Sequence, residues 1–141
     1  MANADTKNAI YANLCAILTA QGFSVNDSSS DPDLETTPLA VPLQVSGGSD
    51  RHSGQNPSKG QVDYIILILF SAPTPADTEN KVNEYVDKVR DPFTIPALNV
   101  GALATTKTKL VIKLPREDYS VDYQPGVTTI SQPLTIHFGQ P

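Results

Sequence analysis

Residues 61–72 read QVDYIILILFSA and form the most apolar run of the chain. In an extended strand, Val62, Tyr64, Ile66, Ile68 and Phe70 lie on one face, and Ile65, Leu67 and Leu69 lie on the other. A strand that is apolar on both faces is typical of the centre of a sheet that is covered on both sides. We therefore predict a central strand here, with helices over one face and a second layer over the other.

The region before this strand predicts one helix and one strand. Apolar residues recur at three- and four-residue steps, as in an amphipathic helix, at Ile10, Tyr11, Leu14, Ile17 and Leu18. Asp5 or Thr6 suits the N-cap of this helix, and Gly22 suits a left-handed C-cap. Residues 38–45 then predict a strand with Leu39, Val41, Leu43 and Val45 on one face. Its two prolines, Pro38 and Pro42, cannot donate to a ladder, so we expect an edge strand or a strand that is paired on one side only.

The connection between the two strands, residues 46–60, contains no apolar residue. Such a stretch cannot pack into a core, so we predict a flexible loop. Long loops of this kind in compact domains are usually functional. A catalytic role for His52 and Ser53 is not expected, because a flexible loop supplies neither an orienting group nor an oxyanion hole.

The region after the central strand predicts a second helix and several strands. The helix starts at Asp77 or Thr78 and ends before Pro92, because the residue that precedes proline avoids helical angles. Its buried stripe consists of Val82, Tyr85, Val86 and Val89. Strand patterns follow at 106–114, 119–123 and 127–138. This order predicts an α+β fold in which two helices pack on one face of a mainly antiparallel β-sheet, within a single domain spanning residues 1–141.

Composition excludes several classes of function. The chain has 141 residues, a net charge of −5 and one cysteine, Cys15, which excludes an internal disulfide. No basic excess is present to displace counterions from phosphates, so tight nucleic-acid binding is not expected. No apolar run reaches the length of a membrane span, and the N-terminus lacks a signal-peptide pattern. We expect that the protein does not associate with a membrane and that it is synthesised in a cytoplasm.

No residue pattern for catalysis or for a cofactor emerges from the sequence. A phosphate-binding glycine loop, a nucleophile elbow and paired catalytic carboxylates are all missing. The acidic residues Asp31, Asp33 and Glu35 lack the glycine and the final glutamate of a calcium loop, and His137 is a lone strand histidine. We therefore expect no enzyme activity, no metal and no cofactor.

The layout resembles the tail terminator (tail-completion) proteins of long-tailed bacteriophages, such as phage lambda. The resemblance covers nearly the whole chain and follows the order of its elements: the first helix at 6–21, the strong strand with its Ala-Pro turn at 62–73, the Ile-Pro-Ala-Leu linker at 95–98, the tyrosine-containing strand at 118–123 and the last strand at 134–138.

The resemblance implies a structural role in a virion. Proteins of this family form a ring, commonly of six subunits, that caps the finished tail tube and joins it to the neck. The implied partners are further copies of the chain, the tail tube protein and a neck or connector protein, with DNA passing through the lumen. Assembly takes place in the host cytoplasm. The loop at 46–60 is then expected to order on docking, with Asp50, Arg51, His52 and Lys59 as its assembly contacts.

Three other functions share most of these features. A neck or head-completion protein and a tail tube subunit are the nearest, and a tube subunit would polymerise alone into long tubes. A small non-viral binding module would remain a monomer even when mixed with tube protein. Neighbouring genes for a head connector and a tail tube would favour the terminator.

Overall fold

The computed structural model describes residues 3–25, 37–50, 59–113 and 119–139. Its elements follow in the order α1 (Asn3–Ala20), β1 (Ser24–Val25), β2 (Leu39–Asp50), β3 (Lys59–Phe70), α2 (Pro75–Arg90), α3 (Ile95–Leu98), α4 (Ala102–Thr105), β4 (Lys109–Lys113), β5 (Ser120–Gln124) and β6 (Val127–Gly139).

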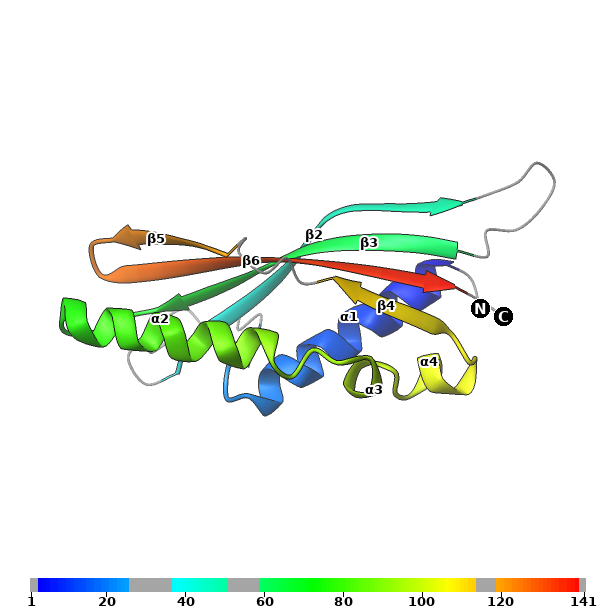
Figure 1. Cartoon of the computed structure of the whole chain (residues 1–141), viewed down its shortest axis with the longest axis horizontal. Helices are drawn as coiled ribbons and strands as arrows, with labels where there is room; N and C mark the ends of the chain where they lie inside the picture. The colour runs from blue at the N-terminus through cyan, green and yellow to red at the C-terminus, as the bar shows by residue number, and fades with distance from the viewer. Residues whose placement is uncertain (1–2, 26–36, 51–58, 114–118, 140–141) are drawn as a thin grey trace.

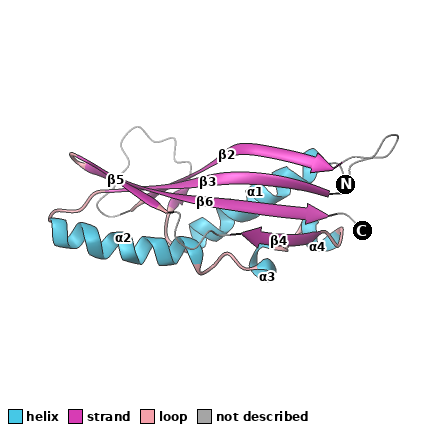
Figure 2. Ribbon diagram, turned by 45° about the horizontal axis from the view of Figure 1, so that its top comes forward, coloured by secondary structure: helices cyan, strands magenta, loops and turns pink. Residues whose placement is uncertain are grey.

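The six strands form one sheet in the order β1-β2-β3-β6-β4 (Figure 2). The short β1 runs parallel to β2, and all other pairs are antiparallel. β5 and β4 share the outer edge of β6, since β5 pairs with its first part and β4 with its last part. β3 lies between β2 and β6, which confirms the prediction that it is a central strand.

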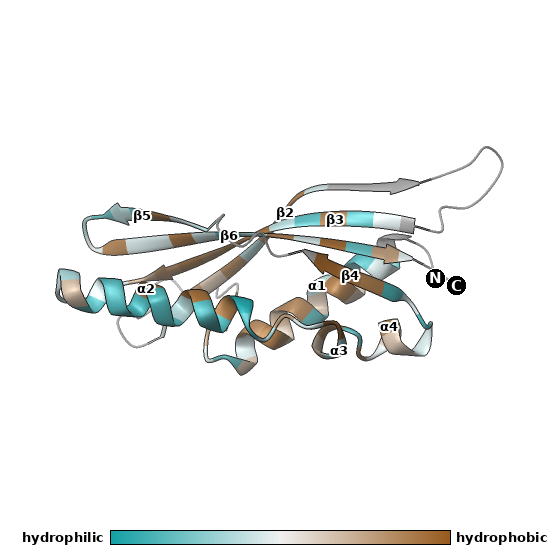
Figure 3. Cartoon of the chain, viewed as in Figure 1, coloured by the Kyte–Doolittle hydropathy of each residue, from teal (hydrophilic) through white to brown (hydrophobic). Residues whose placement is uncertain are grey.

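All helices lie on one face of the sheet (Figure 1). The predicted α+β fold is confirmed, with the two long helices α1 and α2 supplemented by the short helices α3 and α4 in the linker. In Figure 3, β4 and α3 are mostly hydrophobic, whereas the visible side of α2 is largely hydrophilic. This pattern is typical of a surface helix that buries one stripe and exposes the rest.

The core lies between these helices and one face of the sheet. The predicted stripe of α2 is confirmed, because Val82, Tyr85, Val86 and Val89 are buried. The predicted stripe of α1 is confirmed for Ile10, Leu14 and Leu18, which are fully buried, whereas Tyr11 and Ile17 are only partly buried. The sheet contributes alternate residues of β3 and β6: Val62, Tyr64, Ile66, Ile68 and Phe70, with Ile130, Leu134, Ile136 and Phe138. Tyr85 packs edge-on against Phe70 and Phe23, with ring centroids 5.0 and 5.7 Å apart.

Both helices begin earlier than the sequence predicts. α1 already includes Asp5 and Thr6, so neither is its N-cap, and Thr6 is fully buried. α2 begins at Pro75, and the hydroxyl of Thr74 caps it by accepting from the amide of Asp77 at 3.1 Å. Proline suits the first turn of a helix because an N–H at that position would have no hydrogen-bond acceptor within the helix, so its absence costs nothing. The predicted C-cap of α1 is confirmed, since Gly22 has a φ of +93°.

The predicted loop at 46–60 is too long at both ends. β2 continues to Asp50 and β3 begins at Lys59, and these two residues face each other in the register. Pairing of the polar ends is possible because ladder hydrogen bonds use the backbone, not the side chains. Gly60 lies within the ladder opposite Phe138, whose ring occupies the space that a Cβ would need. The rest of the predicted loop, 51–58, lies outside the described residues.

Candidate assembly surface

The face of the sheet that carries no helix is apolar over β2 and β3. Leu39, Val41 and Leu43 of β2 lie directly opposite Leu69, Leu67 and Ile65 of β3. Directly opposed residues in an antiparallel pair share a face and contact each other. These six residues form one continuous surface, called here the apolar patch.

The apolar patch is only partly buried. Leu43 is 44% exposed and the other five side chains are half-buried, whereas Ile66 and Ile68 on the opposite face of β3 are completely buried. The expected second layer over this face is not found among the described residues (Figure 2). The described residues therefore leave that part of the prediction unconfirmed, and they do not account for the apolar character of Ile65, Leu67 and Leu69.

A β-bulge ends the apolar patch. The register of β2 and β3 shifts between Gln44 and Ser46, so Val45 has no direct partner and is 55% exposed. The extra residue at a bulge bends its strand and increases the local twist. Val45 therefore leaves the face that it was predicted to share with Leu39, Val41 and Leu43.

A cluster of polar side chains lies beside the bulge on the same face of the sheet. The carboxylate of Asp63 accepts hydrogen bonds from the hydroxyl of Ser46, from Thr135 Oγ1 at 2.6 Å and from Gln61 Nε2 at 3.0 Å. These donors, above all Ser46 and Thr135, lower the pKa of Asp63, and the neighbouring His137 lowers it slightly further. The cluster joins β2, β3 and β6 and stabilises their register next to the bulge.

We expect Asp63→Asn to make the unfolding free energy less dependent on acid pH. The pKa of Asp63 is lower in the folded chain than in the unfolded chain, so its contribution is complete above the usual aspartate pKa of about 3.9. That contribution is lost as the pH falls through the folded pKa. The difference in unfolding free energy between the wild type and Asp63→Asn should shrink from pH 6 to pH 3, as measured by urea unfolding. A difference in unfolding free energy that stays the same from pH 6 to pH 3 would show that the charge of the Asp63 carboxylate does not contribute to stability.

The four predicted assembly contacts fall into two groups. Asp50 and Lys59 occupy facing positions at the ends of β2 and β3. Arg51 and His52 lie outside the described residues. The apolar patch and the Asp63 cluster were not predicted as a site. The signal for the patch was present, because Ile65, Leu67 and Leu69 make the second face of β3 apolar.

Two further polar groups lie where α1 packs on β3, Tyr64 of β3 and Cys15 of α1. Burial raises the pKa of Tyr64 to about 12, and its hydroxyl has no hydrogen-bond partner among the described residues. Burial also raises the pKa of the Cys15 thiol. A thiol with a raised pKa is a poor nucleophile.

Searches for groups of metal-binding side chains and for membrane-spanning helices give no candidate in the described ranges. No three His, Cys, Asp or Glu residues gather there in a way that could hold a metal ion. No helix of that part of the chain is both long enough and apolar enough to cross a membrane. Comparison of the sequence with protein-family models finds no match, and comparison with curated proteins finds no significant similarity.

Proposed function

We propose that the chain is a bacteriophage tail terminator, a structural subunit that forms a ring at the end of the tail tube, hexameric by analogy with the family it resembles. The ring would stop growth of the tube and present its other face to the neck of the virion. The observation that carries this proposal is the apolar patch on the helix-free face of the sheet.

The patch supports an assembly role because soluble monomers rarely leave large contiguous apolar surfaces uncovered. Its six side chains come from two neighbouring strands and include no charged residue. A surface of this kind is typical of a face that is covered by another subunit. Different surfaces meeting at each contact generate a closed ring when the rotation between subunits closes.

The β2–β3 hairpin gives the proposed ring a means of reaching the tube. Its described end lies at the end of the sheet away from the start of α2, level with Gly139 of β6 and Lys109 of β4 (Figure 1). Asp50 and Lys59 lie at this end, and residues 51–58 connect them. We assign contact with the tail tube to this hairpin, in agreement with the role expected for Asp50, Arg51, His52 and Lys59.

A shortened hairpin tests this assignment. Because Asp50 and Lys59 face each other in an antiparallel pair, an Asn-Gly turn can replace residues 51–58. We expect the melting temperature to change by no more than about 2 °C, since residues 51–58 contain no apolar side chain to bury and the replacement shortens the loop. Binding to the ends of tail tubes, measured by co-sedimentation with tubes of the cognate tail tube protein that the proposal requires, should fall at least tenfold.

Other outcomes of that experiment would contradict the assignment. Unchanged tube binding by the shortened chain would remove the hairpin from the tube contact. A wild-type chain that polymerises alone into long tubes would be a tube subunit, and one that binds only the head connector would be a neck protein.

A further inference from the structure

We propose that neighbouring copies in the ring, besides covering the apolar patch, also meet through two oppositely charged ends of the domain, a contact that rests on the proposed ring-forming function. The acidic end consists of Glu79, Asp122 and Tyr123. The basic end consists of Ile95, Lys107, Lys109 and Val111. The occupant of each end is the opposite end of a second copy of the chain.

The acidic end surrounds a hollow of about 540 Å³ between the start of α2 and the β5–β6 hairpin. Pro73, Pro75 and Tyr123 line the hollow together with Glu79, and no basic residue does so within the described part of the chain. Tyr123 is 63% exposed, which is unusual for an aromatic side chain. Asp122 is exposed on the same hairpin. The hollow therefore offers the Tyr123 ring and the Glu79 carboxylate to a cation, and Asp122 adds a second carboxylate outside the hollow, at the neighbouring position of β5.

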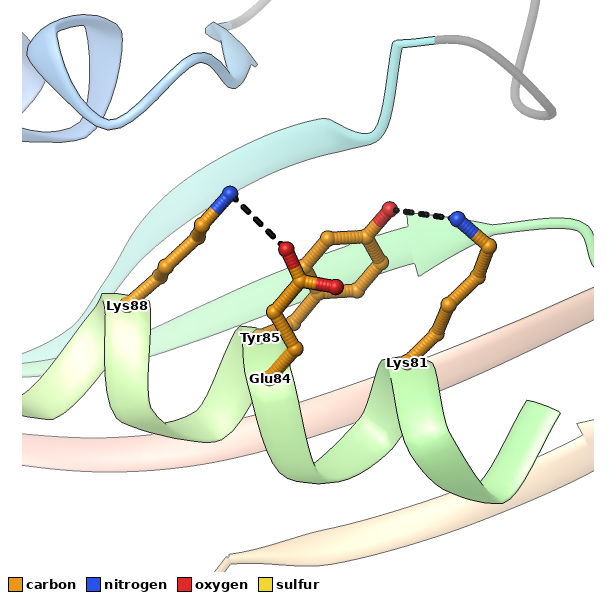
Figure 4. Close-up of polar contacts among 4 residues, drawn as sticks. All are labelled: Lys81, Glu84, Tyr85 and Lys88. Carbon is orange, nitrogen blue, oxygen red and sulfur yellow. Dashed lines mark hydrogen bonds and ion pairs between the residues drawn. The ribbon is translucent and has the colours of Figure 1, made fainter. Parts of the chain in front are cut away.

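The lysines of α2 do not neutralise this end. Lys81 is turned to Tyr85, with its ammonium 3.4 Å from the hydroxyl and 5.6 Å from the ring centroid (Figure 4). Lys88 forms an ion pair with Glu84 at 3.1 Å (Figure 4). Glu79 takes part in neither contact, so its carboxylate is available to a cation from outside the chain.

The basic end surrounds a second hollow, of about 650 Å³, at the free edge of β4. Lys107 and Lys109 line it, and no acidic residue does so within the described part of the chain. Two exposed aliphatic side chains complete it, Ile95 at 46% and Val111 at 53% exposure. The basic end thus combines cations with an apolar surface, as the acidic end combines carboxylates with Tyr123 and two prolines.

The two ends lie too far apart to meet within one copy. Along β6, the acidic end lies beside Thr128 and the basic end beside Phe138. Ten residues of strand separate these positions, which corresponds to roughly 33 Å. Figure 1 shows β5 and the start of α2 at one end of the long axis and β4 at the other. Complementary surfaces at opposite ends produce head-to-tail contacts, and these generate rings when the rotation closes.

The expected contact combines charge and burial. Lys107 and Lys109 of one copy would pair with Glu79 and Asp122 of the next, and a lysine can also lie over the Tyr123 ring. Ile95 and Val111 would cover the apolar parts of the hollow. Ion pairs at such a contact contribute to partner choice and orientation as well as to affinity, and salt weakens those at its rim.

Charge reversal at either end tests the contact between the acidic and basic ends. One variant carries Glu79→Lys with Asp122→Lys, and a second carries Lys107→Glu with Lys109→Glu. A matched control carries Glu84→Lys with Asp87→Lys, because both residues are exposed on α2 but do not line the hollow. Light scattering after size-exclusion chromatography measures the mass, and circular dichroism verifies that each variant melts like the wild type.

We expect each of the two variants to be a 15.1 kDa monomer under conditions in which the wild type and the control form rings. An equimolar mixture of the two variants should form rings again, because every contact in an alternating ring then pairs opposite charges. Rings from either variant alone, or no rings from the mixture, would overturn the contact and leave the proposed function in place. A wild type that stays monomeric with and without tail tubes would overturn both.

Discussion

Ile66→Asp is expected to leave the chain unfolded or insoluble. Ile66 is completely buried in the middle of β3, between Pro42 of β2 and Gln132 of β6. An aspartate there would place a carboxylate without a partner in the core, at a cost of several kcal/mol. Domains of this size have total stabilities of only about 5–15 kcal/mol. Soluble yield and far-UV circular dichroism measure the result.

The neighbouring residue provides the matched control. Ile65 has the same side chain in the same strand but belongs to the half-buried apolar patch. Ile65→Asp should therefore remain folded, with a smaller loss of stability than Ile66→Asp. An Ile66→Asp chain that melts like the wild type would show that the core face of β3 is assigned wrongly. Equal damage from both substitutions would show that both faces are covered within one chain.

Leu43→Asp is expected to abolish ring formation without unfolding the chain. Leu43 is the most exposed residue of the apolar patch and lies opposite Ile65. A neighbouring subunit that covers the patch would bury the new carboxylate, which costs far more than leaving it in water. The free domain should melt within a few degrees of the wild type. Analytical ultracentrifugation should show a monomer where the wild type forms a ring.

Val100→Asp is the control for this substitution. Val100 is 46% exposed, close to the value for Leu43, but lies outside the patch and outside both charged ends. Val100→Asp should form rings as the wild type does. If Leu43→Asp assembles equally well, the patch is not a subunit interface.

Local periodicity explains why so much of the fold is predictable from the sequence. The helix stripes at Ile10, Leu14 and Leu18 and at Val82 to Val89, and the alternation in β3 and β6, reflect burial on one side of a regular element. The start of α2 is not predictable in this way. It depends on the cap from Thr74 and on Pro75 at the first position, not on apolar spacing.

The candidate surfaces depend on pairing between distant segments, which no local pattern reveals. The Asp63 cluster joins residues from three strands, because Ser46 precedes Asp63 by 17 residues and Thr135 follows it by 72. The hollow at the acidic end requires the β5–β6 hairpin to lie beside the start of α2. The polar ends of β2 and β3 were predicted as a loop because the spacing of apolar residues gives no information about backbone pairing.

Growth of tail tubes in the presence of the chain tests the central proposal most directly. Tubes of the cognate tail tube protein that the proposal requires are incubated with the chain, supplied with fresh tube subunits and measured by electron microscopy. The proposal predicts one ring at the end of each tube and no further increase in tube length. Tubes that keep growing, or a chain distributed along their whole length, would contradict it.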